Sequence, residues 1–144
     1  MPTIARSALV SHSSAEMYEL VRDVASYPEF LPWCQATRVV EQTEELQIAS
    51  ITIDRRMRGM RFTTRNRLVE NEAIHLALVD GPFSSLSGTW RFKAIDETAC
   101  RVELEIEFEF RSRLFAALMG PAFTKICDTM VAAFVKRADE INRA

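Results

Sequence analysis

The sequence predicts an α+β domain in which a curved antiparallel sheet wraps around a long C-terminal helix and encloses a hydrophobic cavity. Six segments that alternate apolar and polar residues follow one another between residues 37 and 110, a pattern typical of an antiparallel meander. An apolar stripe at helical spacing then runs through residues 123–141. The inner face of such a sheet can be buried only against that helix, and a strongly bent sheet leaves space beside it.

The N-terminal part begins with a predicted strand over residues 3–10 and continues with a helix. Ser13 or Ser14 offers an N-cap for this helix, and the run that starts there has the spacing of a capping box. The helix is predicted to end near Ser26, because Pro28 disfavours helical geometry in the residue before it.

The meander is predicted to start with a short strand at residues 37–41. In the next strand, residues 46–56, the alternation of apolar and polar residues shifts by one position near Ala49-Ser50, which suggests a bulge. A turn is predicted to follow at residues 58–59. In residues 60–68 the apolar and small polar side chains share one face, while arginines dominate the other.

Three further strands are predicted at residues 74–78, 86–92 and 100–110. In the last of them, apolar residues alternate strictly with charged ones, and the outward positions include Glu103, Glu105, Glu107 and Glu109. This alternation predicts a sheet with one solvated face, so the row of acids indicates a wet surface rather than a metal site.

The chain ends in helical segments. Leu114–Met119 supply a first pair of apolar turns, and Gly120-Pro121 is predicted to interrupt them, with Pro121 suited to the first position of a new helix. The second segment carries the broad stripe that runs from Phe123 to Ile141.

Composition bounds the class of protein. A length of 144 residues suits one domain over residues 1–144, and 48% hydrophobic with 26% charged residues is a globular composition. The net charge of −2 argues against a general nucleic-acid binder but leaves room for a local basic patch. No apolar run reaches 18 residues and no secretory leader is present, so we expect a cytoplasmic protein. Three widely spaced cysteines fit reduced thiols, and no metal site is expected.

The sequence offers no catalytic set. A nucleophilic triad needs a serine or cysteine beside a histidine, but His12 lies at a strand–helix junction and His75 lies on the sheet face opposite the apolar positions. Asn66 and Asp80 are polar residues at nominally inward positions. Asp80 belongs to a Val-Asp-Gly-Pro run that favours a turn cap, with an acid in the cavity as the alternative.

The segment Tyr27–Cys34 places four large apolar side chains around two prolines, more than can all point inward. One interpretation is a plug at the open end of the sheet. The other is a mobile gate or membrane contact, with the apolar residues before Gly120-Pro121 as a second jaw. The candidate gate residues are Tyr27, Phe30, Leu31, Trp33, Phe115, Leu118 and Met119.

Six arginines lie within residues 55–67, which contain no acid. They are either a solvated hairpin paired with glutamates of neighbouring strands, or a contact for RNA phosphates or anionic lipid headgroups. The candidate contact residues are Arg56, Arg58, Arg61, Arg65 and Arg67.

Several blocks, in order, resemble the START-like (polyketide cyclase and lipid transport) superfamily and, within it, the coenzyme Q-binding protein family. The resemblance covers nearly the whole chain and implies a helix-grip fold. The matching blocks are residues 1–10, 17–24, 27–34, 62–66, 78–83, 86–92, 99–101 and 108–110.

The resemblance implies a non-enzymatic protein that binds coenzyme Q (ubiquinone) or a similar isoprenoid lipid as a ligand, with no catalytic cofactor. Such a carrier would meet the inner face of the cytoplasmic membrane and support respiration. The alternative comes from a bacterial branch of ribosome-association toxins, which bind the large ribosomal subunit and block subunit joining. A cyclase-type enzyme is a third class and would need Asp80 or His75 to face the cavity. The candidate cavity residues are Phe62, Leu78, Trp90, Phe92, Phe108, Phe110, Phe123 and Met130.

Overall fold

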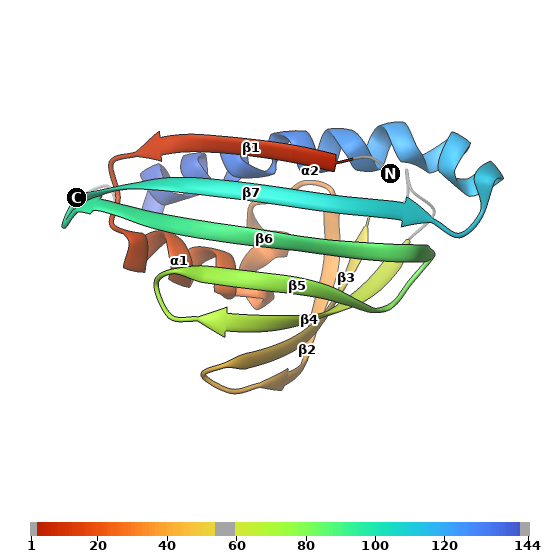
Figure 1. Cartoon of the computed structure of the whole chain (residues 1–144), viewed down its shortest axis with the longest axis horizontal. Helices are drawn as coiled ribbons and strands as arrows, with labels where there is room; N and C mark the ends of the chain where they lie inside the picture. The colour runs from red at the N-terminus through yellow and green to blue at the C-terminus, as the bar shows by residue number, and fades with distance from the viewer. Residues whose placement is uncertain (1–2, 54–59, 142–144) are drawn as a thin grey trace.

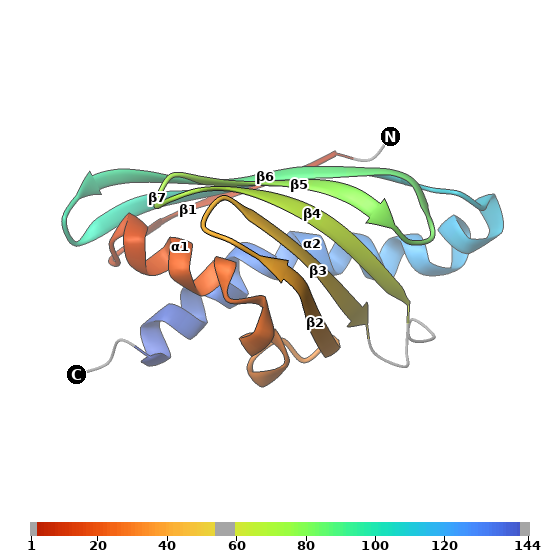
Figure 2. The same cartoon turned by 90° about the horizontal axis from the view of Figure 1, so that it is seen from below.

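A computed structural model describes residues 3–53 and 60–141. Seven antiparallel strands form one sheet in the order β1-β7-β6-β5-β4-β3-β2, so β2 to β7 are a continuous meander and β1 pairs with the last strand. Figures 1 and 2 show the sheet arched over α1 and α2, which lie on its concave side. The elements are β1 (Thr3–Val10), α1 (Ser14–Arg22), the 3-10 helix η1 (Val24–Glu29), β2 (Cys34–Gln42), β3 (Leu46–Ile53), β4 (Arg61–Val69), β5 (Ala73–Asp80), β6 (Phe83–Asp96), β7 (Ala99–Phe110) and α2 (Arg113–Ile141).

The predicted architecture is confirmed. Every second residue of β7, from Cys100 to Phe110, is buried in the core, while the residues between them face outward. Phe123 and Phe134 of α2 are buried against this concave face. The glutamates of β7 lie on the opposite face, as expected of a sheet that is solvated on one side.

The start of α1 confirms the predicted capping box. The Ser13 hydroxyl accepts from the Glu16 backbone N–H at 3.1 Å, and the Glu16 carboxylate accepts from the Ser13 N–H at 3.3 Å. The helix ends at Arg22, earlier than the predicted Ser26. The cause is local, because the Ser26 hydroxyl donates to the Asp23 carboxylate at 2.6 Å and offers the chain an alternative to the helical ladder. The 3-10 helix that follows accommodates Pro28.

Strand β2 corrects two predictions. It starts at Cys34 rather than residue 37, and the irregularities lie in β2, between Cys34 and Ala36 and between Val39 and Glu41, rather than at Ala49-Ser50. Ala49 and Ser50 are both buried because each side of β3 is covered there: Ala49 faces the cavity, and Ser50 shares a hydrogen bond of 2.6 Å with Thr63. The extra residue sits on an edge strand, where a bulge disrupts only one ladder. The turn predicted at residues 58–59 lies outside the described residues.

The interruption predicted at Gly120-Pro121 is wrong. Helix α2 runs without a break from Arg113 to Ile141 and contains Pro121. Met119 and Phe123 flank the pair and are both buried, so tertiary packing holds the two halves in one helix despite the local preference. By length and mean hydropathy alone this helix could cross a membrane, but its buried side chains form the core beneath the sheet.

Candidate functional site: an apolar cavity and an arginine row

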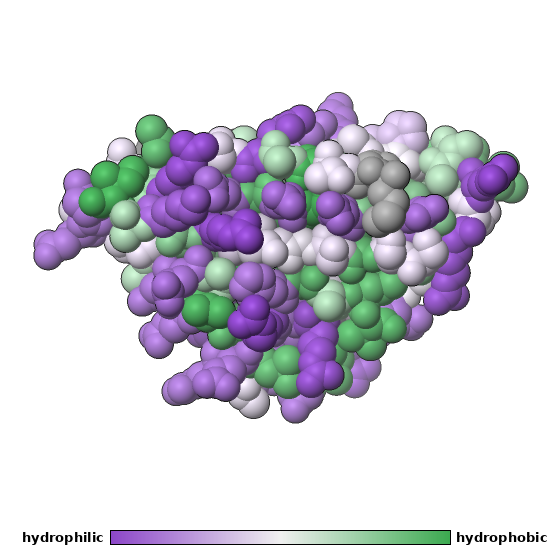
Figure 3. Space-filling view, in the orientation of Figure 1, coloured by the Kyte–Doolittle hydropathy of each residue, from purple (hydrophilic) through white to green (hydrophobic). Residues whose placement is uncertain are grey.

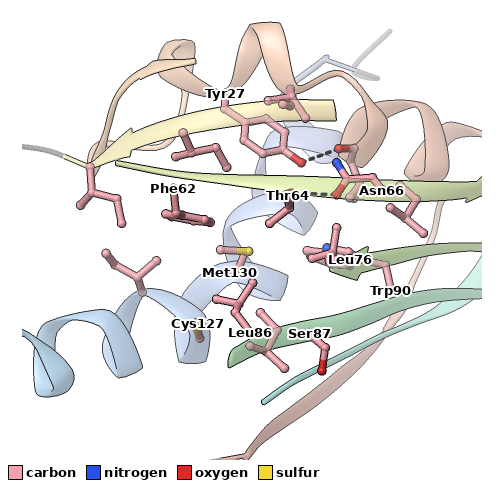
Figure 4. A pocket seen from close by; sticks show the side chains of 18 of the residues that line it. Tyr27, Phe62, Thr64, Asn66, Leu76, Leu86, Ser87, Trp90, Cys127 and Met130 are labelled. Carbon is pink, nitrogen blue, oxygen red and sulfur yellow. Dashed lines mark hydrogen bonds between the residues drawn. The ribbon is translucent and has the colours of Figure 1, made fainter. Parts of the chain in front are cut away.

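A cavity of about 70 Å³ lies between the concave face of the sheet, η1 and α2 (Figure 4). Of the eight predicted cavity residues, Phe62, Trp90, Phe123 and Met130 line it. Other lining residues were not singled out from the sequence, although their inward parity or helical phase is readable there. They include Ile51, Ile53, Leu76, Ile126 and Cys127.

The other four predicted cavity residues lie elsewhere. Phe108 and Phe110 are buried in an aromatic cluster, where Phe110 stacks on Phe83 with the ring centroids 4.7 Å apart. Phe92 is buried against Tyr18. Leu78 is half-buried and does not reach the cavity wall. The three phenylalanines pack against neighbouring rings and so fill the core rather than border empty space.

One end of the cavity is polar. The Thr64 hydroxyl donates to Asn66 Oδ1, and the Asn66 amide donates to Gln47 Oε1, both at 2.8 Å (Figure 4 shows Thr64 and Asn66). Gln47 Nε2 in turn donates to the Arg22 carbonyl and to Gln42 Oε1. The inward position predicted for Asn66 is confirmed, and Gln47 occupies the paired position on β3. Gln47 was not among the predicted site residues, although the alternation of its strand places it on the inner face.

The cavity offers little acid–base chemistry. Burial raises the pKa of the Cys127 thiol to about 12 and the pKa of Cys34 to about 11, so both thiols are protonated at neutral pH. Burial also raises the pKa of Tyr27, whose hydroxyl donates to the Val21 carbonyl. Neither His75 nor Asp80 lines the cavity, and Asp80 is exposed at the end of β5. The acid or base that a cyclase-type enzyme was expected to place in the cavity is therefore not supplied by either residue.

The predicted gate residues Tyr27, Phe30, Leu31 and Trp33 pack onto the core. Tyr27 and Trp33 line the cavity, and Leu31 is fully buried. The Phe30 ring lies 5.3 Å from that of Phe134, with the Arg137 guanidinium 5.1 Å above it. This arrangement favours the plug interpretation, because Tyr27 and Phe30 pack on each other and on Phe134 of α2, and Leu31 and Trp33 belong to the same core cluster.

The residues predicted as a second jaw lie in the first two turns of α2. Phe115 packs against Phe110 at the start of α2, whereas Phe30 packs against Phe134. Nineteen residues separate Phe115 from Phe134, which is about 28 Å along a helix. Leu118 is 55% exposed and Met119 is buried. No ring contact among the described residues joins the two segments, so their pairing as jaws stays a prediction.

Arg61, Arg65 and Arg67 form the arginine row, an exposed line on the outer face of β4. Figure 3 views this side of the sheet, where hydrophilic side chains predominate. Each of the three arginines is paired on β3 or β5 with an apolar residue, such as Ala77, or with Thr52 or His75. None of these paired residues is acidic. Within residues 3–53 and 60–141 the row makes no ion pair, so the predicted pairing with glutamates is not found there. The predicted contacts Arg56 and Arg58 lie outside the described residues.

The nearest row of acids on the outer face is too far away to neutralise these arginines. It lies on β7, three strands from β4, which corresponds to about 14 Å. Within it, Glu103 binds Lys93 at 3.1 Å and Arg101 at 2.9 Å, and these cations lower the pKa of its carboxyl. The acidic row of β7 therefore lies apart from the arginine row, whereas Asp80 of β5 pairs with Thr63, between Arg61 and Arg65.

Comparison with known proteins places the chain in a family. Residues 10–135 match the family model described as polyketide cyclase / dehydrase and lipid transport. The chain belongs to this family. A Vibrio cholerae protein named ribosome association toxin RatA is 45% identical over 141 residues, 98% of each chain. The protein of the same name from Pseudomonas aeruginosa is 44% identical over 138 residues, 96% of each chain.

More distant similar proteins have other names. Coenzyme Q-binding protein COQ10 homolog B of Xenopus laevis is 27% identical over 139 residues, which are 94% of this chain and 57% of that protein. The crystal structure of the Zhui aromatase/cyclase from a Streptomyces species has a TM-score of 0.82, with 18% identity over 99% of this chain and 96% of that one. At that identity the likeness concerns the fold alone. The relatives at 44–45% identity are named toxins.

Proposed function

We propose that this protein associates with the ribosome and inhibits translation without catalysing a reaction, using the arginine row of β4 as its contact with RNA. The observation that carries the proposal is the row itself: three exposed arginines on one face of one strand, with no acidic partner among the described residues. The relatives named ribosome association toxin, at 44–45% identity over nearly the full chain, support the same role.

The spacing of the row suits a polyanion. Arg65 and Arg67 lie two residues apart on one face, which is about 7 Å along a strand, and each carries a guanidinium that binds phosphate oxygens with two parallel hydrogen bonds. The chain as a whole carries a net charge of −2, so attraction to RNA has to come from a local surface. Binding through three phosphates would weaken steeply with salt, by about 0.7–0.9 in log affinity for each contact and each decade of salt.

Co-sedimentation with isolated large ribosomal subunits tests this proposal. The variant Arg61→Glu/Arg65→Glu/Arg67→Glu is expected to lose binding and translation inhibition. A matched control, Arg111→Glu/Arg113→Glu/Lys125→Glu, changes the net charge equally on exposed positions of α2 and the segment before it and should bind as the wild type does. Equal sedimentation of both triple variants and the wild type would refute the contact, and no sedimentation of the wild type would refute the role.

A second function, binding of coenzyme Q or a similar isoprenoid at the inner face of the membrane, is favoured by the apolar cavity with its polar end at Thr64 and Asn66. The likeness to a coenzyme Q-binding protein supports it. The cavity volume weighs against it, because about 70 Å³ is well below the roughly 300–1,000 Å³ of typical ligand pockets. An isoprenoid tail would therefore require the side chains around the cavity to move apart.

Organic-solvent extraction of the purified protein tests this second function. Stoichiometric quinone from quinone-rich cells would support a carrier. A clean extract, together with no quinone uptake from vesicles, would refute it and leave the ribosome proposal untouched.

A further inference from the structure

The basic surface of β4 continues sideways across the sheet. Arg67 pairs with His75 on β5, and the next outward position of β5, Ala73, pairs with Arg91 on β6. Paired side chains on one sheet face stand about 5 Å apart and diagonal ones about 7 Å. Arg67 and Arg91 therefore flank His75 from the two neighbouring strands.

Electrostatics and hydrogen bonding agree with this placement. The pKa of His75 is lowered, first by partial burial and then by the positive charges of Arg67 and Arg91. Its Nδ1 lies 3.3 Å from the hydroxyl of Thr89, the residue paired with it on β6, so Nε2 is the ring nitrogen that Thr89 does not engage. Arg91 is exposed and, like Arg67, makes no ion pair within the described ranges.

Four acids lie around this group, and among them Glu103 alone has cation partners within the described residues. Glu103, paired with Arg91, is held by Lys93 and Arg101. Glu105 pairs with Thr89, one strand beyond His75, and Glu70 and Glu72 occupy the β4–β5 turn. Two cations on either side of a neutral imidazole repel one another, and an anion placed between them removes that repulsion.

We propose that Arg67, His75 and Arg91 form a seat for one RNA phosphate, which extends the ribosome contact from the arginine row across β5 to β6. The inference rests on the proposed function and names part of its surface. A phosphate in the seat accepts hydrogen bonds from both guanidiniums, and its charge favours protonation of His75, whose imidazolium then donates as well. Binding therefore takes up a proton, and affinity for RNA rises as pH falls through the titration of His75.

The test measures the affinity for large ribosomal subunits at several salt concentrations and at about pH 8 and about pH 6. Arg91→Gln should weaken binding about tenfold and reduce the salt slope by about one contact. His75→Gln should bind as the wild type does at the higher pH and lose the gain at the lower pH. Lys93→Gln is the matched control on the same strand and face, and it should change neither, because Glu103 already neutralises Lys93.

The outcomes separate the two proposals. If Arg61→Glu/Arg65→Glu/Arg67→Glu abolishes binding while Arg91→Gln and His75→Gln behave as the wild type does at both pH values, the phosphate seat is refuted and the proposed function stands. If the wild type itself does not bind subunits at low salt, the proposed function fails and the seat fails with it.

Discussion

The side-chain amide of Asn66 donates to Oε1 of Gln47 at 2.8 Å, so two buried amides bind one another at paired positions of β4 and β3. Gln47 extends the network, because its Nε2 donates to the carbonyl of Arg22 at the end of α1. At the other end of this network, the Thr64 hydroxyl donates to Asn66 Oδ1. Buried polar groups are tolerated when they are paired, so this network fixes how the two strands and α1 meet above the cavity.

The first prediction concerns this network. Asn66→Ala leaves Gln47 Oε1 without its donor and Thr64 without its acceptor, and should lower the free energy of unfolding by about 2–3 kcal/mol. The double variant Asn66→Leu/Gln47→Leu removes both amides together and should recover part of that loss. Urea unfolding measures both, and a double variant that is less stable than Asn66→Ala would contradict the pairing argument.

The sequence was informative wherever one face of an element is buried. The alternation in residues 100–110 predicted β7 and its solvated face, and Ser13 predicted the start of α1, because both signals are local. The sequence did not show which inward residues border empty space. Phe108 and Phe123 have the same chemistry, but only Phe123 lines the cavity, because packing across three elements decides which side chain leaves a gap.

The second prediction separates a plug from a mobile gate. Phe30 packs against Phe134 and Tyr27, so Phe30→Ala should lower the free energy of unfolding by about 1–2 kcal/mol, less than a fully buried phenylalanine because the ring is partly exposed. Leu118→Ala is the control, since this side chain is 55% exposed and should change stability by less than about 0.5 kcal/mol. Thermal or urea unfolding distinguishes the plug from the gate. Equal stability of Phe30→Ala and the wild type would favour a gate.

The third prediction fills the cavity. Ala49 is buried and faces the empty space, so Ala49→Val adds two methyl groups there and should raise the free energy of unfolding by about 1 kcal/mol. Ala77→Val adds the same groups on the outer face of β5 and serves as the control. Ribosome binding should be unchanged in both variants, whereas any quinone content should fall in Ala49→Val alone. Marked destabilisation of Ala49→Val would mean that the space is not available.

The fourth prediction concerns pH. Partial burial and the charges of Arg67 and Arg91 hold the folded-state pKa of His75 below its ordinary 6.5, so the unfolded chain binds this proton more readily. The stability contributed by neutral His75 is therefore complete above pH 6.5 and is lost as pH falls through the lowered pKa. Unfolding measured from about pH 8 to about pH 5 should show a shallower decline for His75→Gln than for the wild type. Parallel curves for the two proteins would refute the assignment.

The last prediction concerns Pro121, where local and global signals disagree. At the first position of a separate helix, proline stabilises the chain, and Pro121→Ala would be neutral or destabilising. Inside α2, proline instead removes a backbone hydrogen bond and crowds the preceding turn, so Pro121→Ala should raise the free energy of unfolding by about 1 kcal/mol or more. Pro121 is exposed, so replacing it by alanine removes no buried contacts, and the change in stability reports the backbone effect. A gain measured by urea unfolding supports the continuous helix, and because Met119 and Phe123 are buried on either side of this residue, a loss would mean that α2 is divided where it spans the cavity.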